Sequence, residues 1–280
     1  MDRRRVLAVG LALACSWATA ACDVQVGKDG GLSFDVASAR AQDTWTRSYS
    51  LEGGGRLELI NVNGRIVAEA SAGSAVELVG ERTARASSED AARDLLEKVE
   101  MREEVGPSQA RVEVRAPRHF GPGGVQVQWT IKVPKGTVVD LRNTNGKVEL
   151  NGLAGEVRAQ TVNGGVEGRH LLVQTLDASA VNGGVDVELA APLASGGKVS
   201  LETVNGGVQL ALPRDSAASV VARVTNGGIR TGDLPFTVTG EQNRRRFEGT
   251  LNGGGASVSL ETTNGGIRLS EATGRSKSTS

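Results

Sequence analysis

Residues 199–208 read VSLETVNGGV, and close copies of this stretch recur along the chain. Apolar and polar residues alternate on both sides of each Asn-Gly pair, which is the period-two pattern of β-strands. Glycine takes 38 of the 280 positions, about twice its ordinary share, and it supplies the backbone freedom that a bend needs. Each copy is therefore predicted to be a strand, a bend and a second strand. The asparagines of the copies are Asn63, Asn145, Asn163, Asn182, Asn205, Asn226 and Asn264.

Two architectures fit this repeat. Asn-Gly between alternating strands is a strong hairpin signal, so a meander of β-hairpins is one of them. The other is a β-solenoid, in which each repeat is one coil and equivalent residues stack about 4.8 Å apart. Only stacking explains why the copies are nearly identical, and it would place the asparagines in a hydrogen-bonded ladder that holds the bends in register. We therefore predict a mainly β protein, a parallel β-helix-like solenoid with coils of about 19–23 residues.

Two intervals between copies are longer than the rest. The interval of 82 residues after Asn63 holds an insertion, in which Ser88 and the acids after it predict a helix start. Apolar residues at helical spacing extend this helix to about Glu104, and alternation over 125–133 predicts a strand with Trp129 in the core. The interval of 38 residues before Asn264 is twice 19, which indicates a coil that has lost its signature.

The repeat divides the chain into regions. Residues 44–135 are predicted to form an N-terminal strand and helix cap, and residues 136–270 the regular coils. The cap would cover an end of the solenoid that otherwise exposes a strand edge. Residues 23–43 are expected to be a flexible tether, and residues 271–280 a disordered tail.

The first 22 residues have the features of an export signal. Arg3 to Arg5 are positive, residues 6–13 are apolar, and small residues lead to Cys22. This ending resembles a bacterial lipobox, in which Cys22 carries the lipid; ordinary cleavage after Ala20 is the alternative. We expect an exported, membrane-anchored lipoprotein of the bacterial cell envelope, on the periplasmic side or at the cell surface.

Composition excludes several classes of function. The 32 basic residues balance the 32 acidic ones, so no electrostatic argument favours nucleic acid as a partner. The two histidines, His119 and His170, and the two cysteines are too few for a typical Cys/His metal site. We expect no catalytic residue, no metal and no cofactor.

Two groups of polar and charged residues are candidate sites. The same outward position of successive copies holds side chains of mixed charge, and this mixture favours a solvated sheet face. These residues are Glu149, Glu167, Asp186, Gln209, Arg230 and Arg268. The one charge run after the signal is Arg244, Arg245 and Arg246. It is predicted to be either a solvated loop or a contact for anionic envelope polymers or lipid headgroups.

The order of motifs resembles a bacterial family of candidate adhesins, which carries a domain of unknown function described as β-helical. The motifs are NVNGRI at 61–66, VPKG at 133–136, NTNGKV at 143–148, the TVNGGV copies and LALP at 210–213. The resemblance covers roughly residues 45–270. It implies a non-enzymatic envelope protein whose extended β surface binds a glycan or protein partner. A periplasmic sensor or scaffold for membrane proteins, and a β-helix enzyme acting on polysaccharide, are the alternatives.

Overall fold

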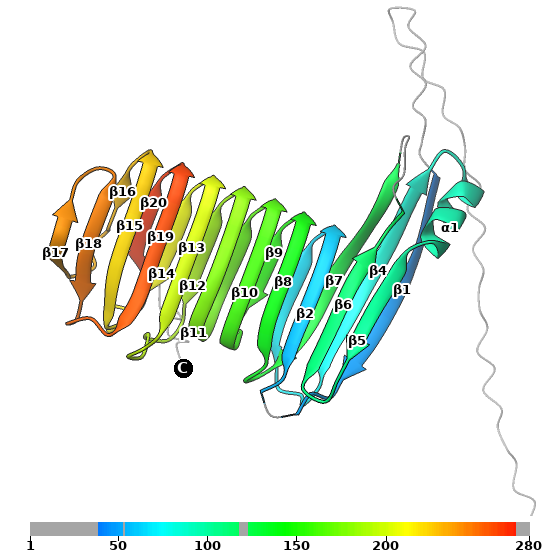
Figure 1. Cartoon of the computed structure of the whole chain (residues 1–280), viewed down its shortest axis with the longest axis horizontal. Helices are drawn as coiled ribbons and strands as arrows, with labels where there is room; N and C mark the ends of the chain where they lie inside the picture. The colour runs from blue at the N-terminus through cyan, green and yellow to red at the C-terminus, as the bar shows by residue number, and fades with distance from the viewer. Residues whose placement is uncertain (1–38, 53, 118–122, 273–280) are drawn as a thin grey trace, which may run out of the picture. The chain divides into compact units, whose positions relative to one another are not determined.

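The computed structural model describes residues 39–52, 54–117 and 123–272. In this part of the chain the strands form two sheets, which we call sheet I and sheet II, on either side of one aliphatic core (Figure 1). Sheet I contains, in spatial order, β5 (Glu100–Val105), β6 (Gln109–Arg115), β2 (Arg56–Asn63), β8 (Val138–Asn145), β10 (Ala154–Asn163), the second part of β11 (Val166–Asn182), β13 (Lys198–Asn205), β19 (Ala256–Asn264), β15 (Ala218–Asn226), β18 (Arg246–Leu251) and β17 (Phe236–Gln242).

Sheet II supplies the opposite wall. It contains, in spatial order, β1 (Ala39–Tyr49), β4 (Val76–Ala86), β7 (Gly124–Pro134), β3 (Ile66–Ser71), β9 (Val148–Asn151), the first part of β11, β12 (Val185–Leu189), β14 (Val208–Leu212), β20 (Ile267–Glu271) and β16 (Ile229–Arg230).

Each Asn-Gly copy is one coil, with a strand in sheet I before the bend and a strand in sheet II after it. The two strands of a coil pair with their equivalents in neighbouring coils and not with each other. For example, β8 pairs in parallel with β2 and β10, and Asn145 lies in register with Asn63 and Asn163. This pairing confirms the solenoid and excludes the meander of hairpins.

The core consists of the apolar residues at matching positions of the coils. Val199 and Leu201 of β13 are buried from sheet I, and Val208 of β14 is buried from sheet II. Equivalent residues stack on them because the register pairs Val199 with Leu176 and Val258. Trp129 of β7 is buried, as predicted, and packs edge-on against Trp45 with ring centroids 5.6 Å apart.

A glycine is required where the bends of neighbouring coils approach each other. Gly146 has a φ of +135°, and a Cβ added there would lie 2.2 Å from the carbonyl oxygen of Gly64. Residues that carry a side chain rarely adopt this backbone conformation, and a non-bonded carbon does not fit 2.2 Å from an oxygen atom. The close stacking of the coils therefore depends on the first glycine after the asparagine.

The N-terminal end of the stack holds the expected helix, but this helix is shorter than predicted. Helix α1 (Glu89–Glu97) begins at the cap residue Ser88, whose Oγ accepts a hydrogen bond from the amide of Ala91 at 3.2 Å. It ends before the predicted limit of Glu104, because the residues that follow it form β5, which is paired antiparallel with β6. Helical spacing in the sequence was outweighed by this edge pairing.

Other N-terminal differences concern the tether. Residues 39–43, expected to belong to it, instead form the first part of β1, which pairs antiparallel with β4. The rest of that stretch and the signal lie outside the described residues, as do residues 273–280 of the expected tail. Within the described ranges α1 is the one helix, and it is not long and apolar enough to cross a membrane.

At the C-terminal end, the interval of 38 residues does not contain a lost coil, so that interpretation was wrong. It contains a hairpin of β17 and β18, and β18 pairs antiparallel with β15. The hairpin needs no Asn-Gly bend because neither strand crosses to sheet II. The last coil consists of β19 and β20. It lies between the coil of β13 and β14 on one side and the coil of β15 and β16 on the other. Figure 1 shows β19 between β13 and β15.

Candidate functional site

The seven asparagines of the copies form one column along the bends. In each neighbouring pair, the Nδ2 of one side chain donates to the Oδ1 of the other, at 2.7 to 2.9 Å. At the N-terminal end, the Nδ2 of Asn63 donates to the carbonyl of Val125 at 3.2 Å. The column therefore runs in the order Asn63, Asn145, Asn163, Asn182, Asn205, Asn264, Asn226, with all donors pointing toward the N-terminal end.

A second row of polar side chains lies beneath this column, and sequence reasoning missed it. Asn143 is buried and donates through Nδ2 to the carbonyls of Gly64, at 2.8 Å, and Gly146, at 3.1 Å. In later coils a threonine does the same: the hydroxyl of Thr203 donates to the carbonyl of Gly183 at 2.7 Å. These side chains satisfy bend carbonyls that would otherwise be buried without a donor. The signal for them was the Asn or Thr that stands two positions before five of the seven repeat asparagines.

The outward column of mixed charge lies on sheet II, and its acidic members are paired. Glu167 contacts Lys147, and its carboxylate also accepts from Arg169 Nε at 2.9 Å. The hydrogen bond from Lys147 holds the pKa of the Glu167 carboxyl below its ordinary value, and the same bond raises the pKa of Lys147. Asp186 is held by Arg169, 2.8 Å away. These acids neutralise basic neighbours and do not form a pair of free carboxylates.

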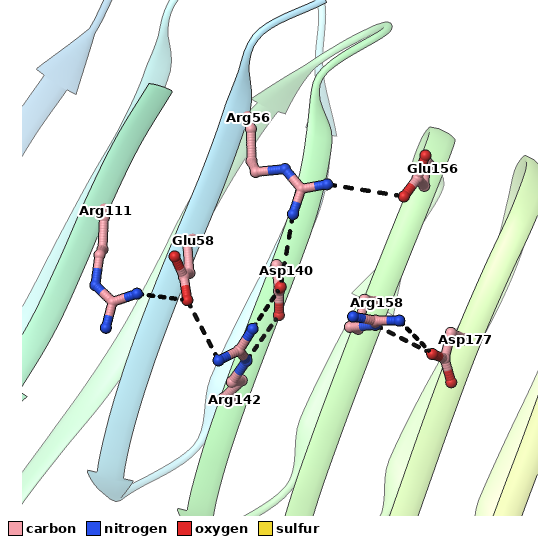
Figure 2. Close-up of polar contacts among 8 residues, drawn as sticks. All are labelled: Arg56, Glu58, Arg111, Asp140, Arg142, Glu156, Arg158 and Asp177. Atoms are coloured by element: carbon pink, nitrogen blue, oxygen red, sulfur yellow. Dashed lines mark hydrogen bonds and ion pairs between the residues drawn. The ribbon is translucent and has the colours of Figure 1, made fainter. Parts of the chain in front are cut away.

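Figure 2 shows a similar set of ion pairs across sheet I. Asp140, whose side chain is 3% exposed, accepts two hydrogen bonds from Arg142, at 3.2 and 3.0 Å, and lies 3.8 Å from Arg56. Glu58 joins Arg142 to Arg111, at 3.4 and 2.9 Å. The network links β6, β2 and β8, and its two carboxylates in β2 and β8, Glu58 and Asp140, are each engaged by two guanidinium groups; Arg56 also lies 3.9 Å from Glu156 of β10. Arg158 and Asp177 make a separate pair between β10 and β11, 3.0 Å apart.

The three arginines of the charge run are separated by the fold. Arg246 is paired with Glu248, with Nε 2.9 Å from Oε1, and lies 3.6 Å from Glu241. The carbonyl of Arg245 accepts from the amide of Val224 at 2.8 Å, and its side chain is exposed. The side chain of Arg244 lies over the bend at Gly228. The three guanidinium groups therefore do not act as one cluster.

Other predicted residues offer no site. Cys22, the expected lipid attachment, and His119 lie outside the described residues. His170 is exposed at the point where β11 passes from sheet II to sheet I, with a φ of +52°. In the part of the chain that the structure describes, no three His, Cys, Asp or Glu side chains are grouped so that they could hold a metal ion.

Comparison with known proteins identifies the family. The sequence profile of the Toastrack DUF4097 family matches residues 130–270, just over half of the chain. The chain belongs to the Toastrack DUF4097 family. No curated protein matches its sequence.

Solved structures place the Toastrack chain beside proteins of similar fold. A candidate cell adhesion protein from Clostridium sporogenes matches with a TM-score of 0.50 and 15% identity, over 82% of this chain and 100% of that one. A candidate adhesin from Bacteroides fragilis matches with a TM-score of 0.39 and 12% identity, over 81% and 97%. A candidate lipid-binding protein from Parabacteroides distasonis matches with a TM-score of 0.35 and 10% identity, over 81% and 96%. The first of these similarities supports the fold.

The carboxylates of both outward networks on the Toastrack surface are engaged in ion pairs. General acid–base chemistry needs a carboxylate or imidazole placed within hydrogen-bond reach of a substrate, and the acidic side chains described above are already held by arginine or lysine. What the arrangement offers chemically is a set of regular, polar rows along two sheets.

Proposed function

We propose that this Toastrack protein is an exported lipoprotein, anchored to a bacterial membrane through Cys22, and that its stack of coils acts as an adhesin in the cell envelope. The observation that carries the binding role is the repetition of outward polar side chains in register from coil to coil. A flat face with a spacing of about 4.8 Å can meet an extended partner at several equivalent points. The partner would be a glycan or a protein of the envelope.

The anchoring part of the proposal is supported by the sequence. Arginines, an apolar stretch and small residues precede Cys22, which is the arrangement expected of a lipoprotein signal. One acyl chain gives weak membrane binding, whereas two or more signals give stable anchoring. A lipid with two or more acyl chains at Cys22 would therefore keep the stack at the membrane surface.

The adhesin part is supported by the description of the similar structure from Clostridium sporogenes as a candidate cell adhesion protein. An adhesin must be reachable from outside the cell. A protein with the same surface but facing the periplasm would instead act as a sensor or scaffold for membrane proteins. Exposure is therefore the property that separates the two roles.

The test is protease shaving of intact cells that produce the wild type or Cys22→Ala, combined with metabolic lipid labelling and fractionation. We expect the wild type to be lipid-labelled, membrane-bound and cleaved from outside. Cys22→Ala should lose both the lipid label and its attachment to the membrane. If the wild type is lipid-labelled but resists the protease until the envelope is opened, this would contradict the adhesin role and favour the periplasmic scaffold. Turnover of envelope glycans by the purified protein would contradict the non-enzymatic role.

A further inference from the structure

A cavity of about 580 Å³ lies at the C-terminal end of the stack, between the last bends and the segment that leads into β18. This is the end of the stack at which Figure 1 labels β15, β16 and β18. Three arginines from three segments line the cavity: Arg230 of β16, Arg268 of β20 and Arg244 before β18. No acidic side chain of the described ranges lines it.

The three arginines reach the cavity from two adjacent coils and from the segment before β18. Arg230 and Arg268 are register partners in adjacent parallel strands, so their side chains leave the same face from backbones about 4.8 Å apart. Like charges placed directly beside each other on a sheet are unfavourable. Arg244 comes from the other side of the cavity, with its Nε 3.8 Å from the point where a Cβ on Gly228 would lie.

The positive charge at this end is not compensated, in contrast to the rest of the same column. Glu149, Glu167 and Asp186 each have a basic partner within 4 Å. Among the described residues, neither Arg230, Arg244 nor Arg268 forms an ion pair or a side-chain hydrogen bond with another residue. The column thus ends in two cations, Arg268 and Arg230, which lack counter-charges within the described structure, and Arg244 adds a third beside them.

The last bend adds a backbone donor beside these cations. In the other six copies, the amide of the first glycine after the asparagine donates to the asparagine carbonyl of the next coil. Gly227 belongs to the outermost coil, and within the described ranges its amide has no acceptor. At the same end, Oδ1 of Asn226 is the terminal acceptor of the asparagine column. Both residues line the cavity.

We propose that this cavity binds a phosphate group. The guanidinium groups of Arg230, Arg244 and Arg268 would hold the phosphate oxygens, since arginine matches this geometry with paired N–H donors. The amide of Gly227 would be a further donor, as backbone amides at bends are in other anion sites. Asn226 Oδ1 would accept from a hydroxyl next to the phosphate. The group could come from a lipid headgroup or from a phosphate outside the membrane, and the proposal does not depend on which side of the envelope the protein faces.

The test measures binding of two probes to the full chain carrying Cys22→Ala, which removes the candidate lipid site from every sample. Pyrophosphate is titrated by calorimetry, and vesicles of phosphatidylglycerol are compared with vesicles of phosphatidylcholine by flotation. We expect Arg230→Gln, Arg244→Gln and Arg268→Gln each to weaken binding by about ten-fold or more, because each removes charge-assisted hydrogen bonds. Binding of pyrophosphate alone would identify a phosphate outside the membrane, and binding of phosphatidylglycerol would identify a headgroup.

Arg245→Gln is the matched control, because Arg245 is the exposed neighbour of Arg244 and does not line the cavity. This variant should bind pyrophosphate with an affinity within about two-fold of wild type, because removing one exposed charge weakens only the screened, long-range attraction for the anion. Equal weakening by Arg245→Gln and Arg244→Gln would show a diffuse basic loop and overturn the proposal. Absence of binding of both probes to the wild type would also overturn it.

A melting experiment keeps the test independent of folding defects. Pyrophosphate should raise the melting temperature of the wild type, because a ligand that binds only the folded state stabilises it. Without the probe, Arg268→Gln should melt at the wild-type temperature or higher, since it removes the repulsion with Arg230. With the probe, its melting temperature should not rise. An equal rise in Arg268→Gln and wild type would contradict the site.

Discussion

Asn226 donates through Nδ2 to Oδ1 of Asn264, 2.9 Å away, although Asn264 comes 38 residues later in the chain. Asn264 in turn donates to Asn205, also at 2.9 Å. The asparagine column is therefore continuous in space but not in sequence order, because the last coil lies between the two that precede it. This inversion makes the coil of Asn226 the outermost one, and the β17–β18 hairpin pairs with that coil at the end of the stack.

The first prediction concerns the column itself. Asn205→Ala removes the bond that Asn205 donates to Asn182 and the one that it accepts from Asn264, both 2.9 Å long. Exposed hydrogen bonds contribute about 0.5–1.5 kcal/mol each, so we expect a loss of about 1–2 kcal/mol and a melting temperature lower by several degrees. Thermal unfolding followed by circular dichroism measures this.

The control for that prediction is Glu202→Ala on the same strand. Glu202 is exposed and makes no ion pair with another described residue, so its removal should change the melting temperature little. The folded β signal should persist in both variants. Equal melting of Asn205→Ala and the wild type would show that the column does not stabilise the bends.

The second prediction concerns the close approach of the bends. Gly146→Ala should be strongly destabilising, because the new Cβ would lie 2.2 Å from the carbonyl oxygen of Gly64 at a φ of +135°. Gly136→Ala is the matched variant: its φ is +82°, and nothing lies within 4 Å of the added Cβ. Gly136→Ala should cost about 1–2 kcal/mol from backbone strain alone, and Gly146→Ala clearly more.

Urea unfolding of the two glycine variants separates the contributions. The difference between their free energies of unfolding reports the steric contact with Gly64 together with the greater backbone strain of alanine at a φ of +135° than at +82°. If the two variants lose the same free energy, the separation between neighbouring bends is adjustable and the close approach is not a requirement of the fold.

The repeat made the coil predictable, because alternation around Asn-Gly reflects contacts between equivalent residues. The order of the coils was not predictable, since Asn205, Asn226 and Asn264 lie in nearly identical surroundings and the sequence does not rank their neighbours. The same holds for the candidate site. Arg230 and Arg268 belong visibly to one outward column, but the sequence predicted a further coil between them, whereas their strands pair directly.

Local signals failed where pairing outweighed them. Residues after Glu97 continue a helical pattern in the sequence, yet β5 pairs with β6 and ends the helix. The hairpin at 236–251 has no repeat signature, and its strands are fixed by pairing with β15 and by the edge-on contact of Phe236 and Phe247, with centroids 5.2 Å apart. Both elements lie at the ends of the stack, where no equivalent coil continues the pattern.

The third prediction concerns this C-terminal hairpin. Phe247 is buried, and replacing a buried phenylalanine with alanine costs about 3–5 kcal/mol. Because a stack of coils is held together by neighbour contacts, we expect Phe247→Ala to loosen β15, β17 and β18 while β8 and β10 stay protected. Hydrogen exchange followed by mass spectrometry measures this by segment. Val238→Ala, at a 44% exposed position of β17, is the control; a uniform loss of protection would show that the stack unfolds as one unit.

The fourth prediction concerns pH and the contact between Glu167 and Lys147. The pKa of Glu167 is lowered in the folded protein, chiefly by the hydrogen bond from Lys147. A carboxyl whose folded-state pKa is lowered stabilises the fold above its unfolded pKa of about 4.3 and loses this contribution as the pH falls through the folded pKa. Glu167→Gln should therefore be less stable than the wild type at pH 7, by less than about 1 kcal/mol for a partly exposed pair.

The difference between the two proteins should shrink as the pH falls below about 4.3 and vanish once Glu167 is protonated in the folded state. Melting temperatures of both proteins between pH 7 and pH 3, at low salt, measure this. Raising the salt concentration should reduce the difference at pH 7, because exposed ion pairs are screened. Glu202→Gln, which removes a carboxylate from an exposed position without an ion pair among the described residues, should show no such dependence. A difference between Glu167→Gln and wild type that stays constant down to pH 3 would mean that packing of the side chain, and not its charge, links the two coils.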